Sequence, residues 1–115
     1  MTALPIDLDP TRIDVRAATS ADGFLITVSG EIDFTTAPGL RTCLLEVLDR
    51  PDAATVEVDL TDVTFLDSAG LSALAMAHRA AEAAGRALPM RVGSTRAVVR
   101  PLQITGLWDV FTVIG

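Results

Sequence analysis

The fold is decided by residues 55–71, which read TVEVDLTDVTFLDSAGL. Over residues 55–61 apolar and polar side chains alternate strictly, a pattern typical of a half-buried β-strand. The last five residues, DSAGL, place a hydroxyl and a glycine directly after the strand, where a long alanine-rich helix ending near Gly85 begins. A strand that passes tightly into a helix favours an α/β architecture.

The residues before this stretch predict a hairpin followed by an amphipathic helix. Residues 13–17 and 24–29 have the composition of strands, and an Asp-Gly turn signal lies between them. Thr35 or Thr36 can cap the helix that follows. Its apolar residues recur at helical spacing and form a buried stripe: Leu40, Cys43, Leu44, Val47 and Leu48.

The residues after it predict a further strand, a last helix and an apolar tail. Residues 88–92 are strand-like, and Pro89 places that strand at an edge or a bulge because proline cannot donate to the ladder. The last helix begins at Ser94 or Thr95, and Pro101 is expected to kink or restart it. Residues 110–114 predict either a final strand or a docked terminus.

The expected fold class is therefore α/β, with helices packed on a mixed sheet of four to five strands. A length of 115 residues and a mass of 12.1 kDa suit one domain, which we expect over residues 13–115 after a loose lead-in over residues 1–12. The N-terminus lacks the pattern of a secretory signal, and no apolar run approaches the roughly 20 residues of a membrane span. The single cysteine permits no internal disulfide. We expect a cytoplasmic protein without a membrane partner.

Composition excludes several chemistries. All nine basic residues are arginine, so the chain has neither the lysine of a P-loop nor that of a pyridoxal enzyme. A net charge of -6 disfavours direct binding to nucleic acid. One cysteine and one histidine are a poor basis for a zinc site, and we expect no metal and no cofactor.

The strongest candidate for chemistry is Ser68. It lies at the first turn of the helix that follows the strand, where free backbone N–H groups and the helix dipole tolerate a phosphate. Asp67 can orient the hydroxyl, and Gly70 allows another protein's backbone to approach closely. The alternative is that Ser68 or Asp67 only caps the helix, which contributes about 1 kcal/mol.

Two enzymatic interpretations of these residues are weak. A Ser68 nucleophile needs a base, but His78 is ten residues further along the same helix, about 15 Å away along its axis. A small acyl hydrolase is therefore disfavoured. Glu31 and Asp33 form a carboxylate pair at a strand end. The preferred interpretation of this pair is a solvated turn, and the second is a part of a docking surface.

Three ordered blocks resemble the STAS domain family and, within it, the bacterial anti-sigma factor antagonists. The blocks are Gly30-Glu31-Ile32-Asp33, the stretch from Val58 to Leu71 with its Asp-Ser-x-Gly-Leu motif, and Thr105-Gly106-Leu107. The similarity spans residues 13–114, and the strand with the Asp-Ser-x-Gly-Leu motif is its most specific part.

The resemblance implies a phosphorylation switch without enzymatic activity of its own. The unphosphorylated antagonist binds an anti-sigma factor that has serine kinase activity and so releases a sigma factor; phosphorylation of Ser68 abolishes binding, and a serine phosphatase restores it. Asp33 is implied to contact the kinase or its nucleotide, and Asp67 to position the hydroxyl. The implied docking surface comprises Asp33, Asp67, Ser68, Ala69, Gly70 and Leu71. Ala69 occupies a place where many members have a second hydroxyl residue.

The resemblance leaves one other function open. Some STAS proteins are constitutive structural or scaffold subunits of a transport ATPase or of a stress-signalling complex. Some members are also reported to bind nucleotides, but no phosphate-binding loop is present here and we expect none. The serine retained in the Asp-Ser-x-Gly-Leu motif favours the switch.

Overall fold

The chain forms one mixed five-stranded sheet. In the computed structural model, which describes residues 12–115, the strand order is β1-β2-β3-β4-β5. β1 runs antiparallel to β2, and the other neighbouring pairs are parallel. This confirms the predicted α/β class, with five strands: β1 (Ile13–Ser20), β2 (Gly23–Ile32), β3 (Thr55–Leu66), β4 (Pro89–Arg91) and β5 (Thr112–Ile114).

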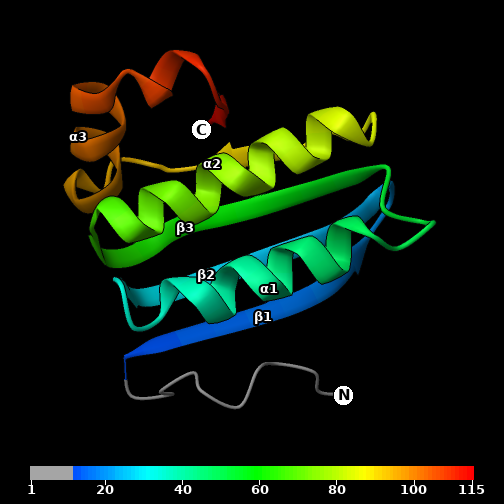
Figure 1. Cartoon of the computed structure of the whole chain (residues 1–115), viewed down its shortest axis with the longest axis horizontal. Coiled ribbons are helices and arrows are strands. Elements are labelled where there is room, and N and C mark those ends of the chain that lie inside the picture. The colour runs from blue at the N-terminus through cyan, green and yellow to red at the C-terminus, as the bar shows by residue number, and fades with distance from the viewer. Residues whose placement is uncertain (1–11) are drawn as a thin grey trace.

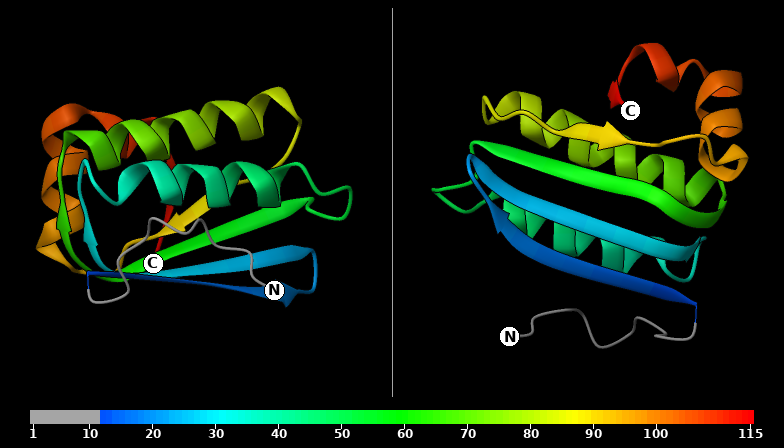
Figure 2. Two further views of the ribbon diagram at one scale, coloured as in Figure 1. Left: turned by 60° about the horizontal axis from the view of Figure 1, so that its bottom comes forward. Right: turned by 180° about the vertical axis from the view of Figure 1, so that it is seen from behind.

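Two helices lie side by side on one face of this sheet, α1 (Ala37–Leu48) and α2 (Ser68–Ala83) (Figures 1 and 2). α1 buries all five residues of its predicted stripe. α2 buries small residues, chiefly alanine, which let its axis lie close to β3. Both helices begin at the same end of the sheet, where β2 and β3 end (Figure 1).

A third helix, α3 (Arg96–Thr105), lies at that same end and leads through a short 3₁₀ turn (Leu107–Asp109) into β5 (Figure 1). The opposite face of the sheet carries no helix (right view of Figure 2). The alternation over residues 55–61 of β3 explains this, because Val56, Val58 and Leu60 are buried beneath the helices while the polar residues between them lie on the other face. Within residues 12–115, no helix combines the length and the apolar character needed to span a bilayer.

The expected edge position of Pro89 and the expected restart at Pro101 are wrong, while the kink expected at Pro101 stays a prediction. β4 is not an edge strand, because it lies between β3 and β5; Pro89 is its first residue and pairs only with Thr112 of β5. A proline is tolerated at the first position of a strand. α3 does not restart at Pro101 but continues through it, held to the core by buried Val98 and Leu102.

Cys43 is buried in α1, as predicted, and burial raises the pKa of its thiol, with the nearby Glu46 as a second cause. We expect the native protein to react with a thiol reagent such as DTNB at pH 8 far more slowly than the protein in urea, because only the exposed thiolate reacts. Absorbance at equal protein concentrations measures both rates. Rapid reaction of the native chain would show that α1 opens readily.

Candidate functional site

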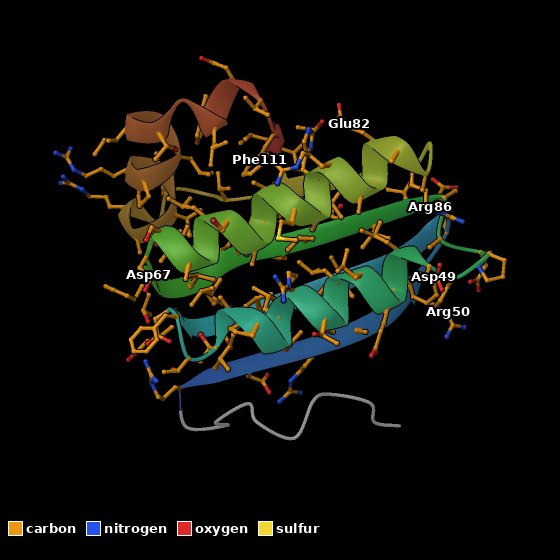
Figure 3. All side chains as sticks on the ribbon, viewed as in Figure 1. Asp49, Arg50, Asp67, Glu82, Arg86 and Phe111 are labelled. Atoms are coloured by element: carbon orange, nitrogen blue, oxygen red, sulfur yellow. The ribbon has the colours of Figure 1, made fainter. Side chains whose placement is uncertain are left out.

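The loops after β2 and β3 are joined at one end of the sheet. The parallel register places Ile32 beside Leu66, and the backbone N–H of Asp67 donates to the carbonyl oxygen of Ile32 at 3.1 Å. Asp33 and Asp67 therefore follow neighbouring strand ends. The structure brings together the two segments that the sequence singled out, and Asp67 marks this end in Figure 3.

Asp67, and not Ser68, is the cap of α2. The Asp67 backbone is extended, and its Oδ1 accepts a hydrogen bond from the Gly70 N–H at 3.0 Å. Ser68 is the first helical residue and is exposed. Its hydroxyl makes no hydrogen bond to any side chain or backbone group from residue 12 onward. Asp67 is therefore the residue that caps the helix, and the hydroxyl of Ser68 takes no part in the cap.

Gly70 serves internal packing, a role that was not predicted from the sequence. It is buried, and a Cβ at this position would lie 2.5 Å from Cδ1 of Leu66 and 2.7 Å from Cγ2 of Ile32. The close approach is made within the chain, so that the first turn of α2 can rest on the ends of β2 and β3. Ala69 and Leu71 are half-buried and pack against the core. The docking role of these three residues stays a prediction.

Asp33 is buried rather than part of a solvated turn, with 7% of its surface exposed. Its Oδ1 accepts hydrogen bonds from Thr35 N (2.9 Å), Thr36 N (3.1 Å) and Thr35 Oγ1 (2.7 Å), while its Oδ2 pairs with the guanidinium of Arg12. Arg12 also donates to Thr35 Oγ1 at 2.5 Å and to Glu31 Oε1 at 3.2 Å. We call Arg12, Glu31, Asp33 and Thr35 the loop clamp. It fixes the connection between β2 and α1.

The two threonines expected to cap α1 do not cap it with their side chains. Thr36 occupies the N-cap position, but its Oγ1 donates to the Glu31 carbonyl oxygen at 2.9 Å and accepts from Asp33 N at 2.9 Å. The carboxylate of Asp33 satisfies the free N–H groups instead. Its Oδ1 is used within the loop and its Oδ2 faces Arg12, so the carboxylate serves to hold the shape of that loop.

Phe34 is the functional candidate that sequence reasoning missed. The clamp holds it at the tip of the loop with 74% of its surface exposed. Together with Pro38 of α1 and Ala69, Ser72 and Met76 of α2, it lines a groove of about 290 Å³ between the starts of the two helices. An isolated aromatic residue within a short polar turn is the signal that could have pointed to it. Exposed aromatic side chains of this kind are typical contacts in protein interfaces.

Neither a metal-ligand cluster nor a histidine is found at this site within the described residues. Within residues 12–115 no three potential ligands lie close enough to hold a metal ion. His78 lies at the middle of α2, where its ring packs against Phe111 and its Nε2 lies 3.5 Å from Glu82. The described residues thus place an exposed serine hydroxyl close to an apolar groove.

The whole described fold corresponds to one known family. The family described as "Mlab, STAS domain" matches residues 11–113, and the chain therefore belongs to the STAS domain family. A solved structure of an anti-sigma factor antagonist from Mycobacterium paratuberculosis superposes with a TM-score of 0.74 at 31% identity, over 91% of this chain and 87% of that one.

Named relatives show which members of the family this chain is similar to. The anti-sigma-F factor antagonist RsfB of Mycobacterium tuberculosis (strain H37Rv) is 34% identical over 108 residues, which cover 92% of this chain and 84% of that protein. The anti-sigma-B factor antagonist of Bacillus subtilis (strain 168) is 29% identical over 102 residues, or 89% of this chain and 91% of the relative. The STAS fold and the likeness to anti-sigma factor antagonists expected from the sequence are thereby confirmed.

Proposed function

We propose that this chain is an anti-sigma factor antagonist that is controlled by phosphorylation of Ser68. In the unphosphorylated form it binds an anti-sigma factor that is also a serine kinase, and a sigma factor is released. A serine phosphatase removes the phosphate and restores binding. The chain is a substrate and a binding module in this scheme, not an enzyme, and it acts in the cytoplasm.

The free hydroxyl of Ser68 is the observation that carries this proposal. Because Asp67 already caps α2, Ser68 is exposed at the helix start with no structural task for its hydroxyl. The positive end of the helix stabilises an added phosphate, so modification leaves the fold intact. Ala69 and Ser72 of the same helix line the groove beside Phe34, so we expect a kinase that reaches this hydroxyl to contact the groove as well.

Phosphorylation then acts on the interface through charge. It adds about -1.5 to -2 charges next to Asp67, on a chain whose net charge is already -6. Charge placed in a close-packed contact costs desolvation and repels acidic groups of the partner. The groove lined by Phe34 and Met76 would supply the apolar part of that contact, and Asp33 would act by holding Phe34 in place.

The alternative of a constitutive structural or scaffold subunit has less support. The relatives reported above carry the name of antagonists, and none of them is named as a subunit of a transport ATPase. A fixed subunit would also have no use for a free serine hydroxyl at the start of α2.

The proposal is tested by phosphate transfer. We expect a purified anti-sigma factor kinase of the host, given ATP, to add one phosphate to the wild-type chain, as measured by intact mass. Ser68→Ala should accept none, because the acceptor is missing. Ser20→Ala is the matched control, since Ser20 is also an exposed serine but lies at the end of β1 and does not line the groove. It should be modified like the wild type. Equal modification of Ser68→Ala and the wild type would refute the assignment.

A further inference from the structure

A basic stripe lies on the outer side of α3. We define it as Arg96, Arg100 and Ile104, which are spaced at i, i+4 and i+8 and so share one helix face. All three are exposed, Ile104 by 70%, while Val98 and Leu102 on the opposite side are buried. Among residues 12–115, neither guanidinium has an acidic group within ion-pair distance.

The stripe is unfavourable for α3 itself. Arg96 is the first helical residue, where the helix dipole is positive, and the first turn contains no acidic residue to compensate. The side chain of the N-cap residue Thr95 makes no capping bond either. A surface position that breaks a local rule without internal compensation is expected where a contact outside the chain uses the residue.

The stripe lies at the same end of the molecule as Ser68. Thr95 Oγ1 donates to the carbonyl oxygen of Val63 at 3.2 Å, which joins the start of α3 to β3 five residues before Ser68. Figure 1 shows α3 beside the start of α2, and Figure 3 shows the same end with Asp67 labelled. The starts of α2 and α3 therefore lie at the same end of the molecule, each joined to the end of β3.

We propose that the basic stripe is a second contact for the anti-sigma factor, where the two arginines pair with an acidic patch on that protein and Ile104 packs within the patch. This inference rests on the proposed function. The chain carries a net charge of -6, so most of its surface repels an acidic protein. Unpaired positive charge at the end of the molecule that contains Ser68 attracts the acidic patch of such a protein and orients it for binding.

An anionic membrane is the less suitable occupant. Lipid surfaces are bound by clusters of about four to eight basic residues. The stripe has two, on a chain whose net charge of -6 is repelled by such a surface. A folded protein with a local acidic patch can approach the stripe without facing the acidic remainder of the chain.

The test compares two double variants that remove the same charge. Arg96→Gln/Arg100→Gln removes the stripe's charge; Arg16→Gln/Arg79→Gln removes two exposed guanidinium groups on β1 and toward the far end of α2. Isothermal calorimetry with the purified anti-sigma factor kinase of the host is run at 50 and 300 mM salt. We expect the stripe variant to bind about 10-fold more weakly at low salt, with a smaller difference at high salt, and the control to stay within about twofold.

The outcomes distinguish a failure of the stripe as a contact from a failure of the proposed function. If the wild type binds and the two double variants bind alike, the stripe is not a contact, while the proposed function stands. If the wild type binds no anti-sigma factor, the proposed function fails and the inference fails with it. Sedimentation with phosphatidylglycerol vesicles tests the membrane alternative. If only the stripe variant loses vesicle binding, and its affinity for the anti-sigma factor is unchanged, the stripe binds a membrane instead. Thermal unfolding checks that both variants remain folded.

Discussion

Ser68→Asp is expected to bind the anti-sigma factor about 100-fold more weakly than Ser68→Ala, with no change in the fold. The aspartate places a full charge beside Asp67 at the centre of the proposed contact, where uncompensated or like charges cost several kcal/mol. Ser68→Ala removes only a hydroxyl that has no hydrogen bond to residues 12–115, and it should bind like the unphosphorylated wild type. Calorimetric Kd values of the two variants measure the difference.

The matched control is Ser20→Asp. Ser20 is an exposed serine at the end of β1, which pairs with Gly23 at the opposite end of the sheet from Ser68. Ser20→Asp adds the same charge to the chain, but at the far end of a molecule whose longest extent is 33 Å. Ser20→Asp should bind like the wild type. Equal Kd values for Ser68→Asp and Ser68→Ala would contradict the charge mechanism.

Gly30→Ala is expected to lower the free energy of unfolding by about 3 kcal/mol or more. Gly30 has a φ of +95°, and a Cβ there would lie 2.1 Å from the carbonyl oxygen of Arg12. That oxygen accepts the Glu31 N–H at 2.6 Å, so the added methyl group would separate the two strands where the loop clamp forms. Positive φ alone costs about 1–2 kcal/mol for a residue other than glycine, and the collision with backbone adds to it.

Urea denaturation of Gly30→Ala and Gly106→Ala separates these two contributions. Gly106 has a φ of +79°, but a Cβ there would meet nothing within 4 Å. Gly106→Ala should therefore lose only the conformational part, about 1–2 kcal/mol. If both variants lose the same amount, the close approach to Arg12 has no energetic consequence.

The strand-helix unit at residues 55–83 could be predicted because its information is local. The alternation of β3 defines its buried face, and Asp67 and Gly70 lie at fixed positions relative to the helix they begin. The most specific part of the resemblance to the STAS family lies in the same residues, and the family match bears the resemblance out. The local pattern could not show which of the two residues caps the helix. The structure shows that Asp67 caps it and that the Ser68 hydroxyl remains free.

The loop clamp and Phe34 could not be predicted because they depend on contacts between distant residues. Arg12 stood in the expected lead-in, and the rest of that lead-in lies outside the described residues. It reaches Asp33 only because the β1–β2 register pairs Ile13 with Gly30. A carboxylate in a turn is usually solvated, and only this guanidinium and the two threonines make its burial favourable. The position of Pro89 depended in the same way on β5, which adds a strand outside β4.

The capped start of α2 also has a consequence for the state of the chain in which Ser68 would be phosphorylated. Its acceptor hydroxyl is displayed by a rigid helical turn whose backbone is tied to a neighbouring strand through Ile32 and Asp67. Under the proposed function, the kinase meets this hydroxyl on a folded helical turn, which the same residues in an unfolded or newly made chain do not present. Phosphate on this serine would then mark only copies that have finished folding, and misfolded copies would neither consume ATP nor compete for the enzyme.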